Sequence, residues 1–160
     1  MSTTTGTVDI LTRLDIDTAA PAFSRALAGL DAAAGRELDR AGIEPGLREL
    51  IRLRASQLNG CAYCVAEHTR GALAAGEPIT RITAISAWRE SSFFTARERA
   101  ALVLTDSMTR AVDTHVPDAD WLDPSTMFSP AELGALVALI TAINAWNIVG
   151  VTTRTWRPEL

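Results

Sequence analysis

Two cysteines and a histidine lie close together in the stretch NGCAYCVAEH of this 160-residue chain, and their types support chemistry. Cys61 and Cys64 are its two cysteines, and His68 is one of its two histidines. Each residue of a helix turns the side-chain direction by about 100°, so these three positions fall within an arc of about 60°. We therefore expect Cys61, Cys64 and His68 to share one helix face.

The predicted position of the cysteines favours the thiolate. Asn59-Gly60 predicts the end of one helix, so Cys61 and Cys64 belong to the first turn of the next. Unpaired backbone N–H groups and the positive end of the helix dipole stabilise a thiolate there. A thiolate attacks a peroxide or a disulfide, and the second cysteine can close a disulfide that prevents further oxidation. His68, one turn further on, is placed to shuttle the proton.

Other chemistry is possible for the same residues. A structural zinc site needs four ligands, and beyond these three only His115 or a carboxylate remains, at no recognised spacing. Haem attachment requires a histidine directly after the second cysteine, where this chain has Val65. Two buried, inert cysteines stay open as an alternative, because free cysteine behaves as a small hydrophobe. We expect neither a metal nor an organic cofactor.

The composition indicates one ordinary globular domain over residues 1–160. Hydrophobic residues make up 48% and charged residues 21%, and the length suits a single core. The net charge is -4 and the basic residues are scattered, which argues against a nucleic-acid partner. All fifteen basic residues are arginine, which excludes lysine Schiff-base chemistry and a P-loop lysine.

Two segments bear on location. Residues 1–9 lack the basic start and apolar run of a secretory signal, so we expect a cytoplasmic protein whose thiols rest reduced. Residues 133–151 carry no charge and are long enough to span a membrane. However, this segment contains Asn144 and Asn147 and lacks aromatic and basic belts on both flanks. We expect it to be buried in a core or a subunit interface, which predicts a homo-oligomer and no membrane partner.

Hydrophobic spacing is helical along most of the chain, and no segment shows sustained two-residue alternation. The sequence therefore predicts an all-α fold of about six helices, with the C-x-x-C at a helix N-terminus. Capping signals at Thr95 and Ser129 open the last two helices. Residues 113–128 are expected to be irregular and residues 1–17 flexible. The predicted helices cover residues 21–41, 45–59, 61–75, 78–88, 95–112 and 129–150.

The stretch ELIRLRASQLNGCAYCVAEH resembles the core of the AhpD-like, carboxymuconolactone decarboxylase superfamily of alkylhydroperoxidase proteins. It has the family's glutamate twelve residues before the first cysteine, then C-x-x-C, then a histidine four residues after the second cysteine. The stretches AGEPITRI and AWRESSFFTARERAALVLTDSMTR continue in the manner of the family. The resemblance covers residues 47–110 and implies an AhpD-like helical domain.

The resemblance implies a role for each motif residue. Cys64 would be the peroxide-attacking thiol, Cys61 the resolving partner, and Glu49 with His68 the proton relay. Tyr63 stands where the best-known peroxidases have a histidine, which implies a simpler relay and slower turnover. The superfamily's lactone decarboxylases lack the cysteine pair, which argues against that reaction. The resemblance also implies a dithiol or lipoyl-type protein as reductant, and a trimer or a multiple of trimers.

Several residues have two interpretations. Glu49 alone would be interpreted as a solvated surface charge. Ser56 lies on the same helix face as Glu49, so it either hydrogen-bonds into the site or packs against another helix. His115 is expected to be solvated. Four further apolar residues would either line a pocket for an organic hydroperoxide or form ordinary core: Trp88, Phe93, Phe94 and Met108.

The sequence thus predicts an enzyme: a thiol-dependent (alkyl)hydroperoxide reductase or disulfide oxidoreductase that serves antioxidant defence. Its supporting residues would be Tyr63 and Ser56. The alternatives are a non-enzymatic redox-sensing or interaction module, and a carboxymuconolactone-decarboxylase-like lyase. Multiple turnover with an added dithiol distinguishes the enzyme from the sensor, and indifference to thiol alkylation identifies the lyase.

Overall fold

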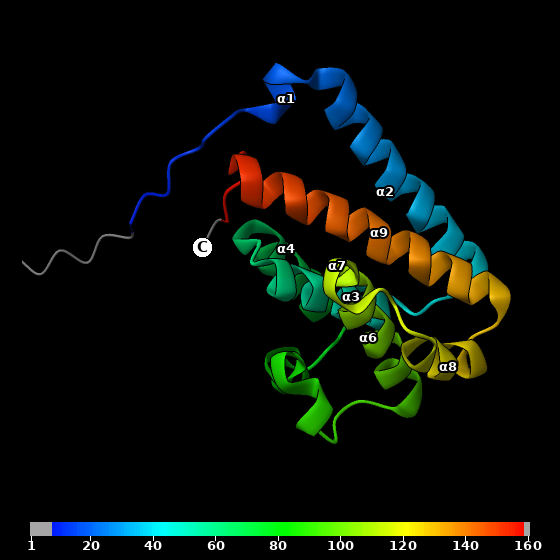
Figure 1. Ribbon diagram of the computed structural model, residues 1–160. Coiled ribbons are helices and arrows are strands. Elements are labelled where there is room, and N and C mark those ends of the chain that lie inside the picture. Colours follow the sequence, from blue (N-terminus) through cyan, green and yellow to red (C-terminus); the bar gives the residue numbers. More distant parts are fainter. Residues whose placement is uncertain (1–7, 159–160) are drawn as a thin grey trace, which may run out of the picture.

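The computed structural model describes residues 8–158, and all regular structure in this part of the chain is helical (Figure 1). This confirms the all-α prediction, although the described residues form more than six helices. The elements are α1 (Ile16–Ala19), α2 (Pro21–Ala41), α3 (Pro45–Asn59), α4 (Ala62–Ala74), α5 (Ile79–Ala84), the 3-10 helix η1 (Ile85–Glu90), α6 (Ala96–Thr109), α7 (Ala111–Thr114), α8 (Asp118–Met127) and α9 (Pro130–Thr153).

Local sequence signals explain the helix boundaries. Pro21 and Pro45 occupy the first turns of α2 and α3, where a missing N–H costs nothing. Gly42 ends α2 with a φ of 70°, a left-handed conformation that glycine adopts without strain. Thr95 and Ser129 form the predicted capping boxes at the starts of α6 and α9. The predicted extents of α2 and α3 are therefore confirmed.

The prediction of an irregular connection over residues 113–128 is wrong, because this region contains α8. Pro124 lies inside α8, where proline removes one backbone hydrogen bond. The side chain of Pro124 is buried and α8 packs against α6, so tertiary packing offsets that loss. The predicted helix over residues 95–112 also divides into α6 and α7 at Arg110, whose φ of -107° is not helical.

The start of the described chain is held against the end of α9. The backbone N–H groups of Arg13 and Leu14 donate to the carbonyl oxygen of Thr153 at 2.8 and 3.1 Å. Asp15 then caps α1 by accepting from the backbone of Asp17. We predicted that residues 1–17 are flexible. Residues 1–7 of that segment lie outside the described residues, whereas residues 13–17 are held in place by these hydrogen bonds.

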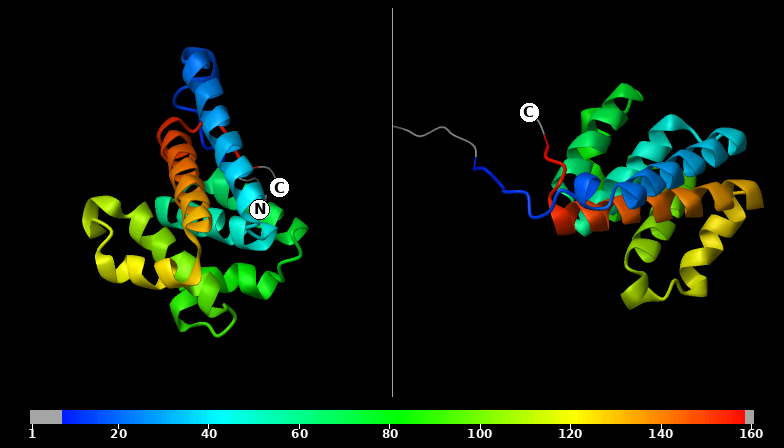
Figure 2. Two further views of the ribbon diagram at one scale, coloured as in Figure 1. Left: turned by 90° about the vertical axis from the view of Figure 1, so that its right-hand side faces the viewer. Right: turned by 90° about the horizontal axis from the view of Figure 1, so that it is seen from above.

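Helix α3 lies at the centre and is buried on two sides (Figures 1 and 2). Leu47 and Ile51 join a core cluster formed with α2, α6 and α9, whereas Leu50 and Leu53 join a second cluster formed with α4, α5, η1 and α6. This double burial fixes α3 rigidly in the molecule. Glu49, which lies between these apolar positions, is consequently carried on a rigid element.

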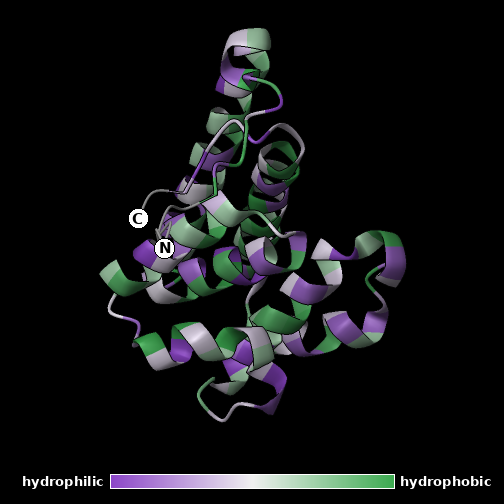
Figure 3. Ribbon diagram, turned by 90° about the vertical axis from the view of Figure 1, so that its left-hand side faces the viewer, coloured by the Kyte–Doolittle hydropathy of each residue, from purple (hydrophilic) through white to green (hydrophobic). Residues whose placement is uncertain are grey.

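Helix α9 runs alongside α2 and also packs on α3 (Figure 2). By length and composition it could cross a membrane, but its residues from Leu133 to Ile143 include many that pack into the core. Most other helices alternate hydrophobic and hydrophilic residues around their circumference (Figure 3). Burial of α9 in the core agrees with the interpretation made from the sequence.

Candidate active site

A tight turn brings α3 and α4 together at the two cysteines. Gly60 adopts a φ of 70°, and the N–H of Cys61 donates to the carbonyl oxygen of Ser56 at 3.1 Å. This arrangement ends α3 and reverses the chain within two residues. Cys61 then serves as the N-cap of α4 and Cys64 lies in its first turn. The predicted position of the C-x-x-C at a helix N-terminus is confirmed.

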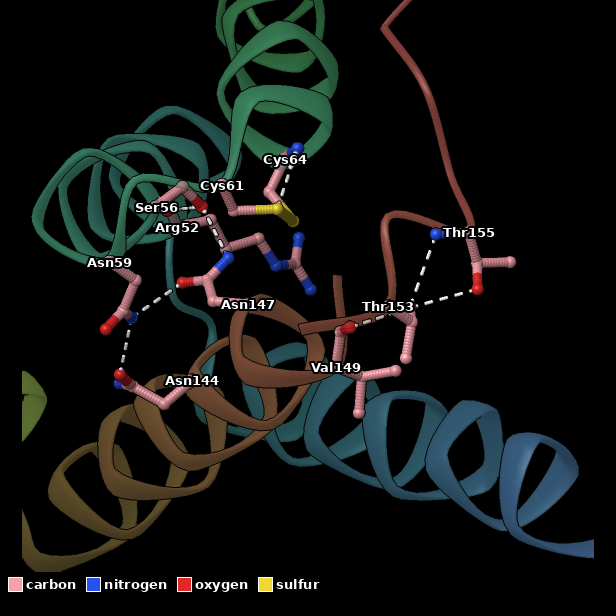
Figure 4. Close-up of a disulfide and its surroundings, with 10 residues drawn as sticks. All are labelled: Arg52, Ser56, Asn59, Cys61, Cys64, Asn144, Asn147, Val149, Thr153 and Thr155. Atoms are coloured by element: carbon pink, nitrogen blue, oxygen red, sulfur yellow. Dashed lines mark hydrogen bonds between the residues drawn. A yellow bond between two sulfur atoms is a disulfide. The ribbon is translucent and has the colours of Figure 1, made fainter. Parts of the chain in front are cut away.

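Cys61 and Cys64 are joined by a disulfide, with their Cα atoms 5.3 Å apart (Figure 4). The backbone N–H of Cys64 also points at Sγ of Cys61, 3.4 Å away. Both residues are nearly covered, with 2% and 4% of their surface exposed. The structure therefore shows the oxidised pair, whereas the sequence led us to expect resting thiols.

The predicted pairing of Glu49 with His68 is present in the structure. Nδ1 of His68 lies 2.9 Å from Oε2 of Glu49, so an ionised Glu49 accepts its hydrogen bond. Arg52 donates to the other carboxylate oxygen at 2.8 Å and lies 3.7 Å from Asp31. A chain of charged groups thus runs from Asp31 on α2 through α3 to the imidazole on α4.

The environment of Glu49 favours its ionised form. Burial acts to raise the pKa of this carboxyl group, but the hydrogen bond with His68 and the neighbouring Arg52 outweigh it. The pKa of Glu49 consequently lies below its ordinary value. An ionised Glu49 holds the Nδ1–H tautomer of His68, which leaves Nε2 as the nitrogen that exchanges protons with a reactant.

A cavity of about 330 Å³ opens at Cys64 and His68. Tyr63, Trp146 and Trp156 form aromatic surfaces in its wall, and the Tyr63 and Trp156 ring centroids are 6.1 Å apart. A cavity with apolar walls and a few polar groups at one end is the usual form of a small-molecule site. The remaining lining residues are Asp31, Arg52, Glu67 and Ile143.

Sequence reasoning missed several of these lining residues. Arg52 follows Glu49 by three residues, and that helical spacing was a usable signal for an ion pair beside the relay. Trp156 lies beyond α9, far from the motif in sequence, and it reaches the site only through the path of the C-terminal segment. Trp156 contacts Trp146 on α9, and their ring centroids are 5.0 Å apart.

Ser56 does not hydrogen-bond into this site, and the packing interpretation holds for it. Its hydroxyl donates to the carbonyl oxygen of Arg52 at 2.7 Å and accepts from Asn147 at 3.0 Å (Figure 4). Asn59 in turn donates to the side-chain oxygens of Asn144 and Asn147. These amides satisfy one another and connect α3 to α9, so they position the turn that carries the cysteines.

Of the two interpretations of Trp88, Phe93, Phe94 and Met108, ordinary core holds for all but Phe93. Trp88 and Phe94 are buried in the core cluster beside α5, and Met108 packs against the other cluster. Phe93 is half exposed. These side chains stabilise the fold, and none of them lines either cavity at the cysteines. His115 is exposed, as expected.

Comparison with known proteins gives one family match and one sequence relative. Residues 21–107 match the carboxymuconolactone decarboxylase family. Over 104 residues the chain is 38% identical to YdfG, an uncharacterized protein of Bacillus subtilis. That alignment covers 65% of this chain and 71% of YdfG.

Two solved structures share this fold. A protein of unknown function from Agrobacterium tumefaciens, provisionally described as the antioxidant defence protein AhpD, superposes with a TM-score of 0.86 at 33% identity. The match covers 94% of this chain and all of the other. The debrominase Bmp8 superposes with a TM-score of 0.73 at 19% identity, over 87% of this chain and 73% of its own. At that identity the likeness to Bmp8 shows the fold alone.

Proposed function

Because the chain belongs to the carboxymuconolactone decarboxylase family and holds a disulfide beside a carboxylate–imidazole pair, we propose that it is a thiol-dependent hydroperoxide reductase. The observation that carries this proposal is the joint placement of Cys64 and His68 on one small cavity, with Glu49 behind the imidazole. The description of the Agrobacterium neighbour as an antioxidant protein supports the same class.

The proposed oxidative step uses the reduced pair. Nε2 of His68 takes the proton of the Cys64 thiol, the thiolate attacks the terminal oxygen of a hydroperoxide, the O–O bond breaks, and the alcohol leaves with that proton. Cys64 is then a sulfenic acid. The Cys61 thiol attacks its sulfur, the thiol proton leaves with the hydroxyl group as water, and the Cys61–Cys64 disulfide forms. Two electrons from an external thiol reductant restore the pair.

The chain's own residues supply what these steps need. Cys64 lies in the first turn of α4, where the free N–H groups and the helix dipole favour a thiolate. Arg52 lines the same cavity and is paired with Glu49 and Asp31. The walls formed by Ile143, Trp146 and Trp156 are apolar, which suits an organic hydroperoxide better than hydrogen peroxide.

The decisive experiment is peroxide consumption by Cys64→Ser in the presence of excess thiol. Consumption should fall to the background rate while the circular dichroism spectrum stays helical; unchanged consumption would falsify the assignment. Cys61→Ser is the matched control, because it keeps the attacking thiol; without added thiol it should consume one equivalent of peroxide and form no internal disulfide. A redox sensor would instead show a single turnover in the wild type, and a lyase would tolerate alkylation of both thiols.

We also propose that the protein is a cytoplasmic homo-oligomer, a trimer or a multiple of trimers. The support is apolar surface that remains on α2 and α9, where Phe23 is 52% and Ile148 is 63% exposed. Exposed large hydrophobic side chains on neighbouring helices suit a subunit contact. A reducing compartment would also supply the thiol reductant that the cycle requires.

A further inference from the structure

A second and larger cavity lies on the other side of the disulfide. Its volume is about 990 Å³, within the range of small-molecule sites. It is enclosed by the segment before α1, the start of α4, the end of α9 and the C-terminal segment. Cys61 lines this cavity, whereas Cys64 lines the smaller one.

Tyr63 and Trp156 separate the two cavities. Both residues line both cavities, and their rings are tilted by 38° with centroids 6.1 Å apart. The two cysteines of the disulfide consequently line different cavities. Gly150 also lines the larger one, and a Cβ built on it would lie 3.0 Å from Sγ of Cys61. The absence of a side chain at Gly150 therefore lets α9 lie close to the Cys61 sulfur.

The larger cavity has a surplus of positive charge. Arg13, Arg154 and Arg157 line it, opposed by Asp9. Arg157 pairs with Asp9 at 2.9 Å, and Arg13 donates to the backbone of Thr152. Arg154 is partly buried, and no carboxylate among residues 8–158 lies within ion-pair distance of it. A partly buried guanidinium without a carboxylate partner is suited to bind an anionic group.

We propose that the larger cavity admits an anionic thiol reductant, which attacks Cys61. This inference rests on the proposed function only in taking the disulfide to be redox-active. The reductant's thiolate attacks Sγ of Cys61, the Cys61–Cys64 bond breaks, and Cys64 leaves as a thiolate. A second thiol, on the same reductant molecule or on another one, then attacks the mixed disulfide. The reductant is oxidised to a disulfide, and Cys61 is released and takes a proton from water.

Attack at Cys61 also releases Cys64 as a thiolate, which is the form that attacks the peroxide. A thiol with a lower pKa leaves faster in thiol–disulfide exchange. Cys64 lies in the first turn of α4 and lines the same cavity as His68, which favours its departure as a thiolate. Separate cavities then let the peroxide and the reductant approach different sulfurs without competing for space.

The charge of the reductant provides one test, which needs no peroxide. The oxidised protein is reduced by mercaptoethanesulfonate, which is anionic, and by mercaptoethanol, which is neutral. We expect the ratio of the two rate constants to fall about threefold to fivefold in Arg154→Gln. Arg36→Gln is the matched control, because Arg36 is exposed on α2 and its loss changes the net charge equally. An unchanged ratio in Arg154→Gln would overturn the proposal.

Two further measurements test the proposal without the Arg154→Gln variant. In the wild type, added salt should lower the same ratio, because screening weakens the attraction of the anion to arginine. Ala66→Phe narrows the larger cavity and should slow reduction by both thiols, whereas Ala74→Phe, further along α4 at an exposed position, is the control. Reduction at the wild-type rate in Ala66→Phe would show that thiols arrive from elsewhere. Loss of peroxide activity alone would refute the proposed function and leave this test intact.

Discussion

Gly71 faces Glu49 so closely that a side chain on it would displace the carboxylate. A Cβ built on Gly71 would lie 2.6 Å from Oε2 and 2.8 Å from Cδ of Glu49. The two residues stand equally far along the chain from Gly60, so the turn places them opposite each other on α3 and α4. Oε2 is the same oxygen that holds His68. The contact between Glu49 and His68 thus requires a residue without a side chain at position 71.

We therefore predict that Gly71→Ala folds but loses about tenfold in peroxide consumption, the size of effect expected when a general acid is poorly oriented. Alanine raises helix propensity by roughly 1 kcal/mol, which works against destabilisation. Gly134→Ala is the matched control, because a Cβ at that helical position meets nothing within 4 Å. Steady-state kinetics with urea unfolding checks both variants. Full activity in Gly71→Ala would show that Glu49 shifts freely without losing its function.

Much of this site could be predicted from local sequence. The Asn59-Gly60 helix end fixes the reversal between α3 and α4, and helical periodicity then places Cys61 and Cys64 in one first turn. The contact of Glu49 with His68 depends on how two helices pack after that turn. The family pattern implied that the two residues work together, but only the structure gives the distance of 2.9 Å between them.

Other features depended on tertiary packing and escaped prediction. The two prolines near α8 look like helix breakers locally, but burial of Pro124 against α6 stabilises that helix. Trp156 reaches the cysteines because the C-terminal segment folds back over α9. Trp88 and Phe94 are aromatic residues of the kind that line ligand pockets, but the structure buries them in the core. Sequence separation hides each of these contacts.

The lowered pKa of Glu49 makes a prediction about acid stability. The folded protein binds fewer protons at this carboxyl group than the unfolded chain, so stability rises with pH through the interval between the two pKa values. The contribution is complete above the unfolded pKa, about 4.3, and is lost as pH falls through the lower folded value. The free energy of unfolding of the wild type should therefore drop in acid more steeply than that of Glu49→Gln.

Urea unfolding at a series of pH values from about 3 to 6 measures this difference. Glu44→Gln serves as the control, because Glu44 is exposed at the start of α3 and no side-chain hydrogen bond to the helix is made there. The control should follow the wild-type curve. Parallel curves for the wild type and Glu49→Gln would contradict the lowered pKa.

The amide network beneath the turn should behave as one unit. Asn147 is fully buried, donates to Ser56 and accepts from Asn59. We predict that Asn147→Ala lowers the free energy of unfolding by about 2 kcal/mol, because buried polar partners lose their hydrogen bonds. Ser56→Ala should cost about 1 kcal/mol. The double variant should cost less than the sum by about 1 kcal/mol, and additive effects in urea unfolding would show that the two residues act independently.

The apolar surface of α9 leads to a prediction about assembly. Light scattering should give a mass of three times 17.1 kDa, or a multiple of that mass. Ile148→Glu places a charge on the exposed side of α9 and should dissociate the oligomer, because burying an unpaired charge in a subunit contact is costly. Val112→Glu is the matched control, since Val112 on α7 is 82% exposed and has no proposed contact. A wild-type protein that remains a monomer at high concentration would refute the proposed assembly, while the same mass in Ile148→Glu would place the contact away from this part of α9.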